Sequence, residues 1–173
     1  RHEVTRMTEA LRPAFRNADW ATKIEYINEN ENFYYSDGIE LVDFGPGFAT
    51  MIMPLLPRHL NLQGNVHGGW LATMVGQAAG KAAMSYGYFV TPEQLSLNYH
   101  TTCSGGTLHA KAKEKNRGKH LGIYTVDVTD DNDKLIVSGT VTLFIQDNEI
   151  DFPREKRNVA GLNFASGRQE DML

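Results

Sequence analysis

The pattern of apolar and polar residues divides the chain into a helical start, a long apolar helix and a series of strands. Apolar residues at three- and four-residue intervals predict helix over residues 3–32, with an interruption at Pro13. Two short apolar runs, 39–44 and 48–55, are joined by a Gly-Pro-Gly turn and predict a pair of strands. Residues 58–66 have no period and are rich in polar residues, which predicts a loop.

Residues 68–86 are rich in Ala and Gly, with aliphatic residues between them and few charges. The segment is too long for a strand, so it predicts a helix that is apolar over most of its circumference and therefore buried. Gly76 and Gly80 lie one turn apart, and each costs about 1 kcal/mol relative to Ala inside a helix. Small residues in this arrangement indicate that a sheet or a ligand packs very closely against the helix.

The rest of the chain alternates between apolar and polar residues with a period of two. Short turns rich in Gly, Asn or Asp separate four such runs, at 95–102, 107–115, 120–129 and 135–145. This spacing predicts a four-stranded antiparallel meander. One buried helix against six strands is a two-layer α+β domain, and its open sheet edges favour a second copy as cover.

Length, charge and composition narrow the picture. A chain of 173 residues is one domain in size, which we divide into an N-terminal helical extension (1–36), the main domain (37–146) and a polar C-terminal arm (147–173). The net charge of −4 makes nucleic acid an improbable partner, and no apolar run approaches a membrane span. One cysteine forms no internal disulfide, which favours a reducing, cytoplasmic compartment. No pair among the six histidines has metal-ligand spacing, so we expect no metal site.

Two segments carry a resemblance to a known family. Residues 61–69 (NLQGNVHGG) resemble the His-Gly-Gly motif of acyl-CoA thioesterases of the phenylacetate-degradation (PaaI-like) branch. Residues 117–119 (RGK) and 134–139 (KLIVSG) resemble the last strands of the same family. The resemblance covers about residues 39–145. It implies the hotdog fold, in which an antiparallel sheet wraps one long helix. It also implies a homodimer or a dimer of dimers, and an acyl-coenzyme A ligand with no other cofactor.

Thioester hydrolysis requires that the substrate carbonyl is polarised. The free N–H groups at a helix N-terminus can polarise it, because they point toward the developing negative charge. The resemblance implies that the Gly68 N–H is the oxyanion donor, while Gly69 lets substrate approach the backbone closely. It also implies that Asn61 helps place a water or carboxylate, and that His67 orients the loop or contacts the thioester. Taken alone, the same residues also fit a tight turn and a structural histidine, so both interpretations stay open.

The sequence departs from the family at the position of the catalytic acid. The family carries a carboxylate nine residues after the motif histidine, and that position is Gly76 here. Gln77 can position water but cannot take a proton. Glu93, close to Thr91 where the family has an assisting Ser or Thr, could replace the acid, and so could His67. The remaining alternative is an acyl-CoA binding or sensing protein without turnover.

Basic residues at a predicted hairpin tip, Arg117, Lys119 and His120, either meet the phosphates of coenzyme A or form a solvated turn. Phe33 and the two tyrosines after it are interpreted as core or interface packing, with an acyl-lining role as the alternative. The sequence therefore favours an acyl-CoA thioesterase, slow because Gly76 replaces the acid, with a non-hydrolytic binder as the second hypothesis.

Overall fold

A computed structural model describes residues 15–150 of the chain. In chain order the elements are a 3₁₀ turn at Phe15–Asn17, α2 (Trp20–Asn30), α3 (Asn32–Asp37), β1 (Glu40–Gly45), β2 (Phe48–Pro54), a 3₁₀ turn at Pro57–His59, α4 (Gly68–Met84), β3 (Tyr88–Tyr99), β4 (Thr107–Arg117), β5 (Leu121–Thr129) and β6 (Leu135–Glu149). The helix predicted for residues 68–86 is confirmed as α4.

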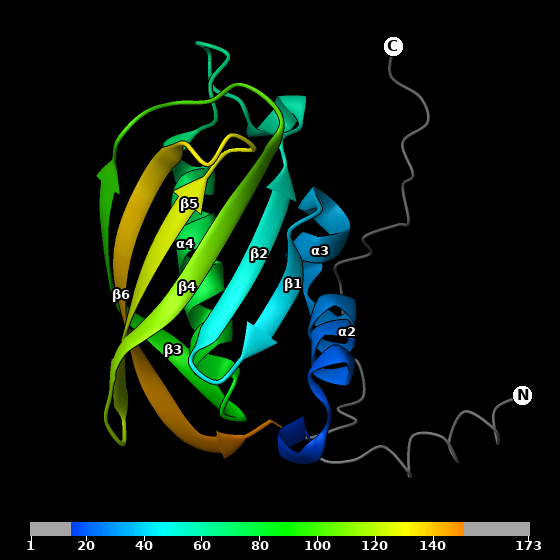
Figure 1. The fold of residues 1–173 in the computed structure, drawn as a ribbon, viewed down its shortest axis with the longest axis vertical. Coiled ribbons are helices and arrows are strands. Elements are labelled where there is room, and N and C mark those ends of the chain that lie inside the picture. Colours follow the sequence, from blue (N-terminus) through cyan, green and yellow to red (C-terminus); the bar gives the residue numbers. More distant parts are fainter. Residues whose placement is uncertain (1–14, 151–173) are drawn as a thin grey trace, which may run out of the picture.

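The six strands form one antiparallel sheet in the order β1-β2-β4-β5-β6-β3, and α4 lies across its inner face (Figure 1). The buried face of α4 carries Leu71, Met74, Val75, Ala78 and Ala82, which pack into the sheet core. Gly139 allows the closest approach, because a Cβ there would lie 2.5 Å from Val75 Cγ1. The predicted α+β hotdog architecture is confirmed.

The pairing of β3 differs from the predicted meander. β4, β5 and β6 do form a meander, but β3 pairs with β6 at the edge of the sheet, and residues 100–106 cross the ends of β6 and β5 to reach β4. Alternation predicts that a segment is a strand but does not choose its partner, which explains the error. β3 also begins at Tyr88, well before residue 95, and β6 continues to Glu149, so residues 147–149 are strand and not arm.

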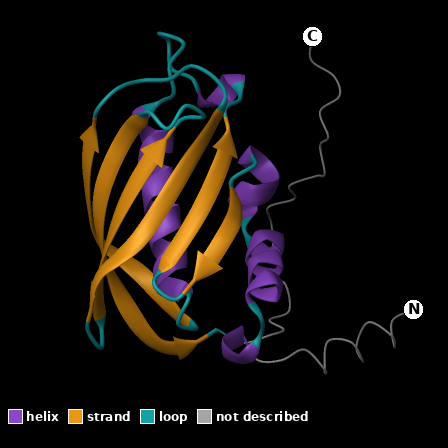
Figure 2. Cartoon of the chain, viewed as in Figure 1, coloured by secondary structure: helices purple, strands orange, loops and turns teal. Residues whose placement is uncertain are grey.

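The two helices before the sheet cover its other edge, beside β1 (Figure 2). The buried carboxamide of Asn28 acts as a substitute strand partner: its Nδ2 donates to Leu41 O and its Oδ1 accepts from Leu41 N, both at 2.9 Å. Helix is confirmed over residues 20–30, but the chain starts a second short helix at Asn32, where the sequence predicted an end. The predicted helix over 3–14 and the arm beyond residue 150 lie outside the described residues, and the domain boundaries stay predictions.

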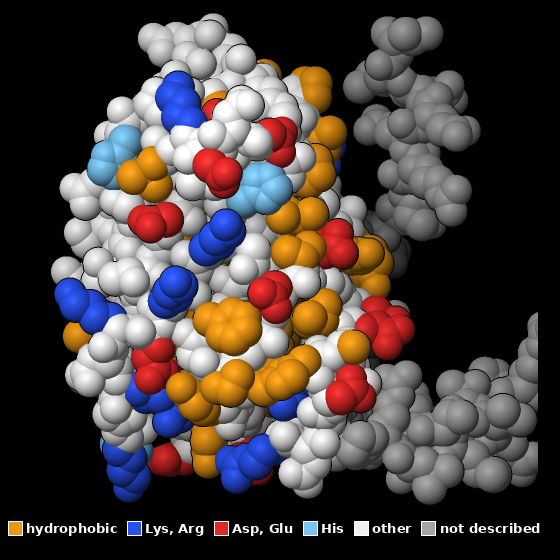
Figure 3. Space-filling view, viewed as in Figure 1, with side chains coloured by type: hydrophobic (Ala, Val, Ile, Leu, Met, Phe, Trp, Pro, Cys, Tyr) orange, Lys and Arg blue, Asp and Glu red, His pale blue; other side chains and the backbone are white. Residues whose placement is uncertain are grey.

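The outer face of the sheet mixes basic and acidic side chains, as the space-filling view shows (Figure 3). This face therefore presents no continuous basic surface of the kind that a phosphate backbone requires. Within residues 15–150, no helix is both long enough and apolar enough to cross a membrane.

Candidate active site

The loop before α4 is built around Asn61. Its Oδ1 accepts hydrogen bonds from Gln63 N (2.9 Å) and Asn65 N (3.2 Å), which closes an Asx turn. Gly64 completes the turn at φ +74°, a conformation that favours glycine. The carboxamide oxygen of Asn61 is therefore engaged by the turn, and its proposed role in placing a water or carboxylate stays a prediction.

His67 caps the N-terminus of α4. Its Nδ1 accepts a hydrogen bond from Gly69 N at 3.1 Å, which assigns the ring proton to Nε2, and its carbonyl accepts from Trp70 N at 2.9 Å. The N–H of Gly68, the first residue of the helix, has no hydrogen-bond partner among the described residues. A free N–H at the positive end of a 17-residue helix is the arrangement that an oxyanion donor requires.

Tyr99 also belongs to this end of the helix, although the sequence did not single it out. Its hydroxyl donates to Gly68 O at 3.1 Å, and its ring lies 3.5 Å from the position that a Cβ on Gly68 would occupy. The side chain comes from the edge strand β3 and is half exposed. It therefore shields one side of the Gly68 peptide and leaves less room for a side chain at that position.

A buried histidine that the sequence did not reveal holds this loop in place. His59 is fully buried; its Nδ1 accepts from Leu56 N (3.1 Å), so its Nε2 carries the proton toward Asp37 Oδ1 (3.3 Å). Burial raises the pKa of the Asp37 carboxyl, but hydrogen bonds from neighbours, Arg58 Nε at 3.0 Å among them, outweigh it and hold that pKa below its usual value. Because His59 O accepts from His67 N at 2.9 Å, this network fixes the backbone that precedes α4.

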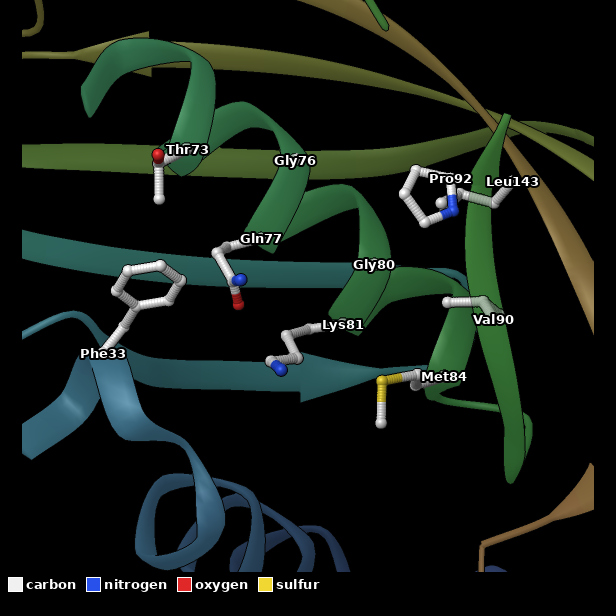
Figure 4. Close-up of a pocket in the computed structure, with 10 residues that line it drawn as sticks. All are labelled: Phe33, Thr73, Gly76, Gln77, Gly80, Lys81, Met84, Val90, Pro92 and Leu143. Atoms are coloured by element: carbon white, nitrogen blue, oxygen red, sulfur yellow. The ribbon is translucent and has the colours of Figure 1, made fainter. Parts of the chain in front are cut away.

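A cavity of about 360 Å³ lies along the side of α4 that faces away from the middle of the sheet. Its lining comes from α4, α3, β3 and β6 (Figure 4): Phe33, Thr73, Gly76, Gln77, Gly80, Lys81, Met84, Val90, Pro92 and Leu143. A Cβ at Gly76 or at Gly80 would meet no atom within 4 Å, so both glycines open onto this space. Gly76 and Gly80 therefore face a cavity, whereas Ala78 and Ala82 of the same helix pack into the core. Close packing against a ligand stays a prediction.

Two polar side chains interrupt the apolar lining. Gln77 Oε1 is buried and has no hydrogen-bond partner within residues 15–150. Lys81 is only 8% exposed, and its Nζ lies 2.7 Å from Glu31 Oε2, which comes from the junction of α2 and α3. The sequence did not reveal this pair, although a lysine on a buried helix indicates that a carboxylate must come from elsewhere in the chain.

The residues predicted for one site are spread over the chain. Gly68 and Gly76 are eight residues apart on α4, about 12 Å along the helix axis. Thr91 and Glu93 lie inside β3 and not at its start, and both are exposed. Thr91 Oγ1 accepts from Gln146 Nε2 at 2.8 Å, whereas Glu93 does not line the cavity. A single chain therefore does not gather the proposed oxyanion donor, the acid position and Glu93 around one thioester.

The basic hairpin lies near the C-terminal end of α4, opposite the His-Gly-Gly motif. The Arg117 guanidinium stacks 3.9 Å from the centre of the Tyr86 ring, and its Nε is buried without a partner. The His120 ring stacks on Phe144 with 5.9 Å between the centroids, and its Nδ1 is likewise buried and unpartnered. Lys119 is exposed. Arg117 and His120 are thus packed groups with one free polar atom each, and only Lys119 projects freely.

Other chemistry finds little support among the described residues. Burial, followed by the charge of Asp130, raises the pKa of the Cys103 thiol, which opposes a role as nucleophile. Within residues 15–150, no three His, Cys, Asp or Glu side chains form a group that could hold a metal ion. The α4 N-terminus and the cavity beside Gly76 are therefore the two features that fit the sequence hypothesis.

Comparison with known proteins bears on this geometry. Residues 63–137 match the model of the thioesterase superfamily, so the match includes the His-Gly-Gly motif, α4 and the strands as far as the start of β6. The matched segment, which is fewer than half of the 173 residues, is similar to thioesterases. The Escherichia coli acyl-coenzyme A thioesterase PaaI is 25% identical over 124 residues, 66% of this chain and 89% of that protein.

Solved structures agree with the fold. The structure of Escherichia coli PaaI superimposes with a TM-score of 0.70 over 73% of this chain and 92% of that one, at 23% identity. The Streptococcus mutans protein smu.793, solved bound to acetyl-CoA, gives a TM-score of 0.60 at 26% identity over 62% of this chain and 88% of that one. These structures agree with the hotdog fold, and both the thioesterase activity and its substrate are matters for proposal.

Proposed function

We propose that this protein hydrolyses an acyl-coenzyme A thioester to the free acid and coenzyme A. The observation that carries the proposal is the cavity beside Gly76, because it lies at the helix position where the family resemblance implies the reacting thioester. Its volume of about 360 Å³ is within the range of small-molecule sites. Relatives support the ligand class: PaaI is named an acyl-CoA thioesterase, and smu.793 was solved bound to acetyl-CoA.

The chemistry at the α4 N-terminus follows from its free N–H. As water attacks the thioester carbon, the carbonyl oxygen becomes negative, and the Gly68 N–H together with the helix dipole stabilises that charge. Loss of one such donor commonly costs about 10²–10³ in kcat. His67 supports this step indirectly: because its Nδ1 is engaged by Gly69 N, its most direct contribution is to fix the first turn of the helix.

We further propose that two copies of the chain form each site. In one chain Gly68 and Gly76 lie about 12 Å apart along α4, which is too far for one thioester carbonyl to meet both. The outer edge of β3 is unpaired among the described residues, and Leu95 and Tyr99 on this strand are 41% and 54% exposed. A second copy against this edge would cover it and bring its own α4 N-terminus toward the cavity. A dimer of dimers is the larger alternative.

The hairpin with Lys119 is the proposed contact for the phosphates of coenzyme A. Lys119 projects freely, and the Arg117 guanidinium adds positive charge beside it, while Arg117 Nε and His120 Nδ1 are buried. Hydrolysis consumes only water, so we propose no cofactor beyond the coenzyme A of the substrate. The lone cysteine is the reason that we expect a reducing, cytoplasmic setting.

A second function is favoured by one observation. Gly76 has no carboxylate, and the adjacent Gln77 amide cannot accept a proton in the reaction. A chain with an acyl-CoA cavity and no proton acceptor would bind or sense acyl-CoA without turnover.

A panel of acyl-CoA esters separates the two functions when binding and release of free thiol are measured side by side. Hydrolysis predicts binding together with thiol release for at least one ester. Binding without thiol release from any ester would favour the acyl-CoA sensor over the enzyme. If no ester is bound and none is hydrolysed, both functions are excluded.

A further inference from the structure

No carboxylate lies among the described residues that line the cavity, so an acid that serves it must come from a residue in contact with that lining. One qualifies: Glu31, whose Oε2 lies 2.7 Å from the Nζ of the lining residue Lys81. It reaches α4 across a separation of fifty residues, from the point where α2 ends and α3 begins. Glu93, the acid that the sequence offered, is exposed and does not line the cavity.

The Glu31 carboxylate is held in place but is not fully occupied. Although Glu31 is the residue that precedes α3, its side chain makes no capping hydrogen bond. Lys81 holds Oε2, and Oε1 has no hydrogen-bond partner among the described residues. The side chain remains 24% exposed, so water can reach it. One oxygen is thus anchored and the other is free to accept a proton.

A second polar group lies next to this pair. Gln77 and Lys81 are four residues apart and so are neighbours on one face of α4. Figure 4 shows the Gln77 amide and the Lys81 side chain projecting to the same side of α4, toward Phe33. Gln77 Oε1 is buried and unpartnered, and a buried acceptor of this kind requires a donor. The proposed position of the attacking water is one in which it donates a hydrogen bond to Gln77 Oε1 and another to Glu31 Oε1.

We propose that Glu31 is the general base of the hydrolysis and replaces the carboxylate that Gly76 lacks. This inference rests on the proposed thioesterase function. The water oxygen attacks the thioester carbon as Glu31 removes one proton. The tetrahedral oxyanion then collapses, the carbon–sulfur bond breaks, and the departing thiolate takes the proton from Glu31. The products are the carboxylic acid and the thiol of coenzyme A, and Glu31 returns to its carboxylate form.

The reach of a general base defines where the reacting carbon must lie. A carboxylate oxygen lies about 2.6–3.2 Å from the water that it activates, and that water lies about 3–3.5 Å from the carbon that it attacks. A base therefore acts about 6 Å from the reacting carbon. Lys81 follows Gly76 by five residues, about 7.5 Å along the axis, and both line the cavity, so the proposal places the reacting carbon between these two positions.

An ion pair that only docks α3 onto α4 would produce different results, and variants separate the two roles. Glu31→Gln keeps the size and removes the base, and Glu29→Gln is the matched control because Glu29 is an exposed acid on α2. We expect Glu31→Gln to lower kcat by about 10²–10⁴ with KM changed only a few-fold, and to remove the acid limb of the kcat–pH profile. Glu29→Gln should behave as the wild type.

Rescue is the decisive readout. Gly76→Asp in the Glu31→Gln background restores a carboxylate beside the same reacting carbon, so kcat should rise by a larger factor than the same change produces in the wild type. A protein that merely lost a docking contact would gain no more from Gly76→Asp than the wild type does. If Glu31→Gln fails to fold, Glu31→Gln/Lys81→Met removes the whole buried pair without leaving an unpaired charge and serves in its place.

A folded Glu31 variant with wild-type kcat overturns the inference while the proposed function stands. A wild-type protein that releases no thiol from any acyl-CoA overturns both.

Discussion

Restoring a carboxylate at Gly76 is the most informative change in this protein. The position has room, since a Cβ there meets nothing within 4 Å, and it opens onto the 360 Å³ cavity. Replacing glycine inside a helix with aspartate gains about 0.3 kcal/mol in helix propensity. Partial burial of the new carboxylate opposes this gain, so we expect a folded variant whose stability is unchanged or slightly lower.

The gain in rate can be estimated from the role of the group. A well-placed general base contributes about 10²–10⁴ in rate, or roughly 3–5 kcal/mol of barrier. If Glu31 already supplies part of that effect, Gly76→Asp in the wild-type background should raise kcat by about tenfold or more. We expect Gly76→Asp to raise kcat by a larger factor in the Glu31→Gln background.

The assay is release of free thiol from saturating acyl-CoA, with Gly76→Asn as the control, because asparagine matches aspartate in size but takes no proton. Thermal unfolding of both variants checks that they are folded. A folded Gly76→Asp protein with the same kcat as the wild type and as Gly76→Asn would refute the placement of the thioester beside this turn of α4.

Three further changes test other parts of the structure. Asn28→Ala strips both backbone hydrogen bonds from Leu41 and should lower the free energy of unfolding by about 2–4 kcal/mol in denaturant titrations. Replacing Arg117 and Lys119 together with Ala should weaken binding of coenzyme A esters by about 1–3 kcal/mol, less so in high salt, and leave simple thioesters unaffected; an unchanged dissociation constant would end that assignment. The lowered pKa of Asp37 stabilises the fold above the unfolded-state pKa of about 3.9, and that contribution is lost as pH falls through the folded-state value. The wild type should therefore lose stability more steeply than Asp37→Asn on acidification below about pH 4, and parallel curves would contradict this.

The sequence predicted the elements of the fold better than their connections. An apolar helix rich in small residues and strands of period two are local patterns, and α4, β1, β2, β4 and β5 appear close to their expected bounds. The place of β3 beside β6 is not a local property, because its alternation fits any antiparallel neighbour. The short α3 was also missed, since six residues without a clear period give little signal.

The site residues show the same contrast between local patterns, which the sequence reveals, and long-range contacts, which it does not. The His-Gly-Gly motif predicted where α4 begins, and the count from His67 to Gly76 predicted which turn lacks an acid. Glu31 was not predicted because it lies fifty residues from Lys81 and has no motif around it. Phe33 was interpreted mainly as packing, and it forms one wall of the cavity. Contacts of this kind depend on how the N-terminal helices dock against α4. The spacing of residues along the chain does not predict this docking.

A crystal structure with a non-hydrolysable acyl-coenzyme A analogue, in which a methylene replaces the thioester sulfur, tests the central claim most directly. We predict that the acyl group occupies the cavity between Phe33 and Gly76, with its carbonyl oxygen within about 3 Å of a Gly68 N–H from a second copy. An analogue bound with its acyl group elsewhere, and the cavity beside Gly76 without it, would contradict the account.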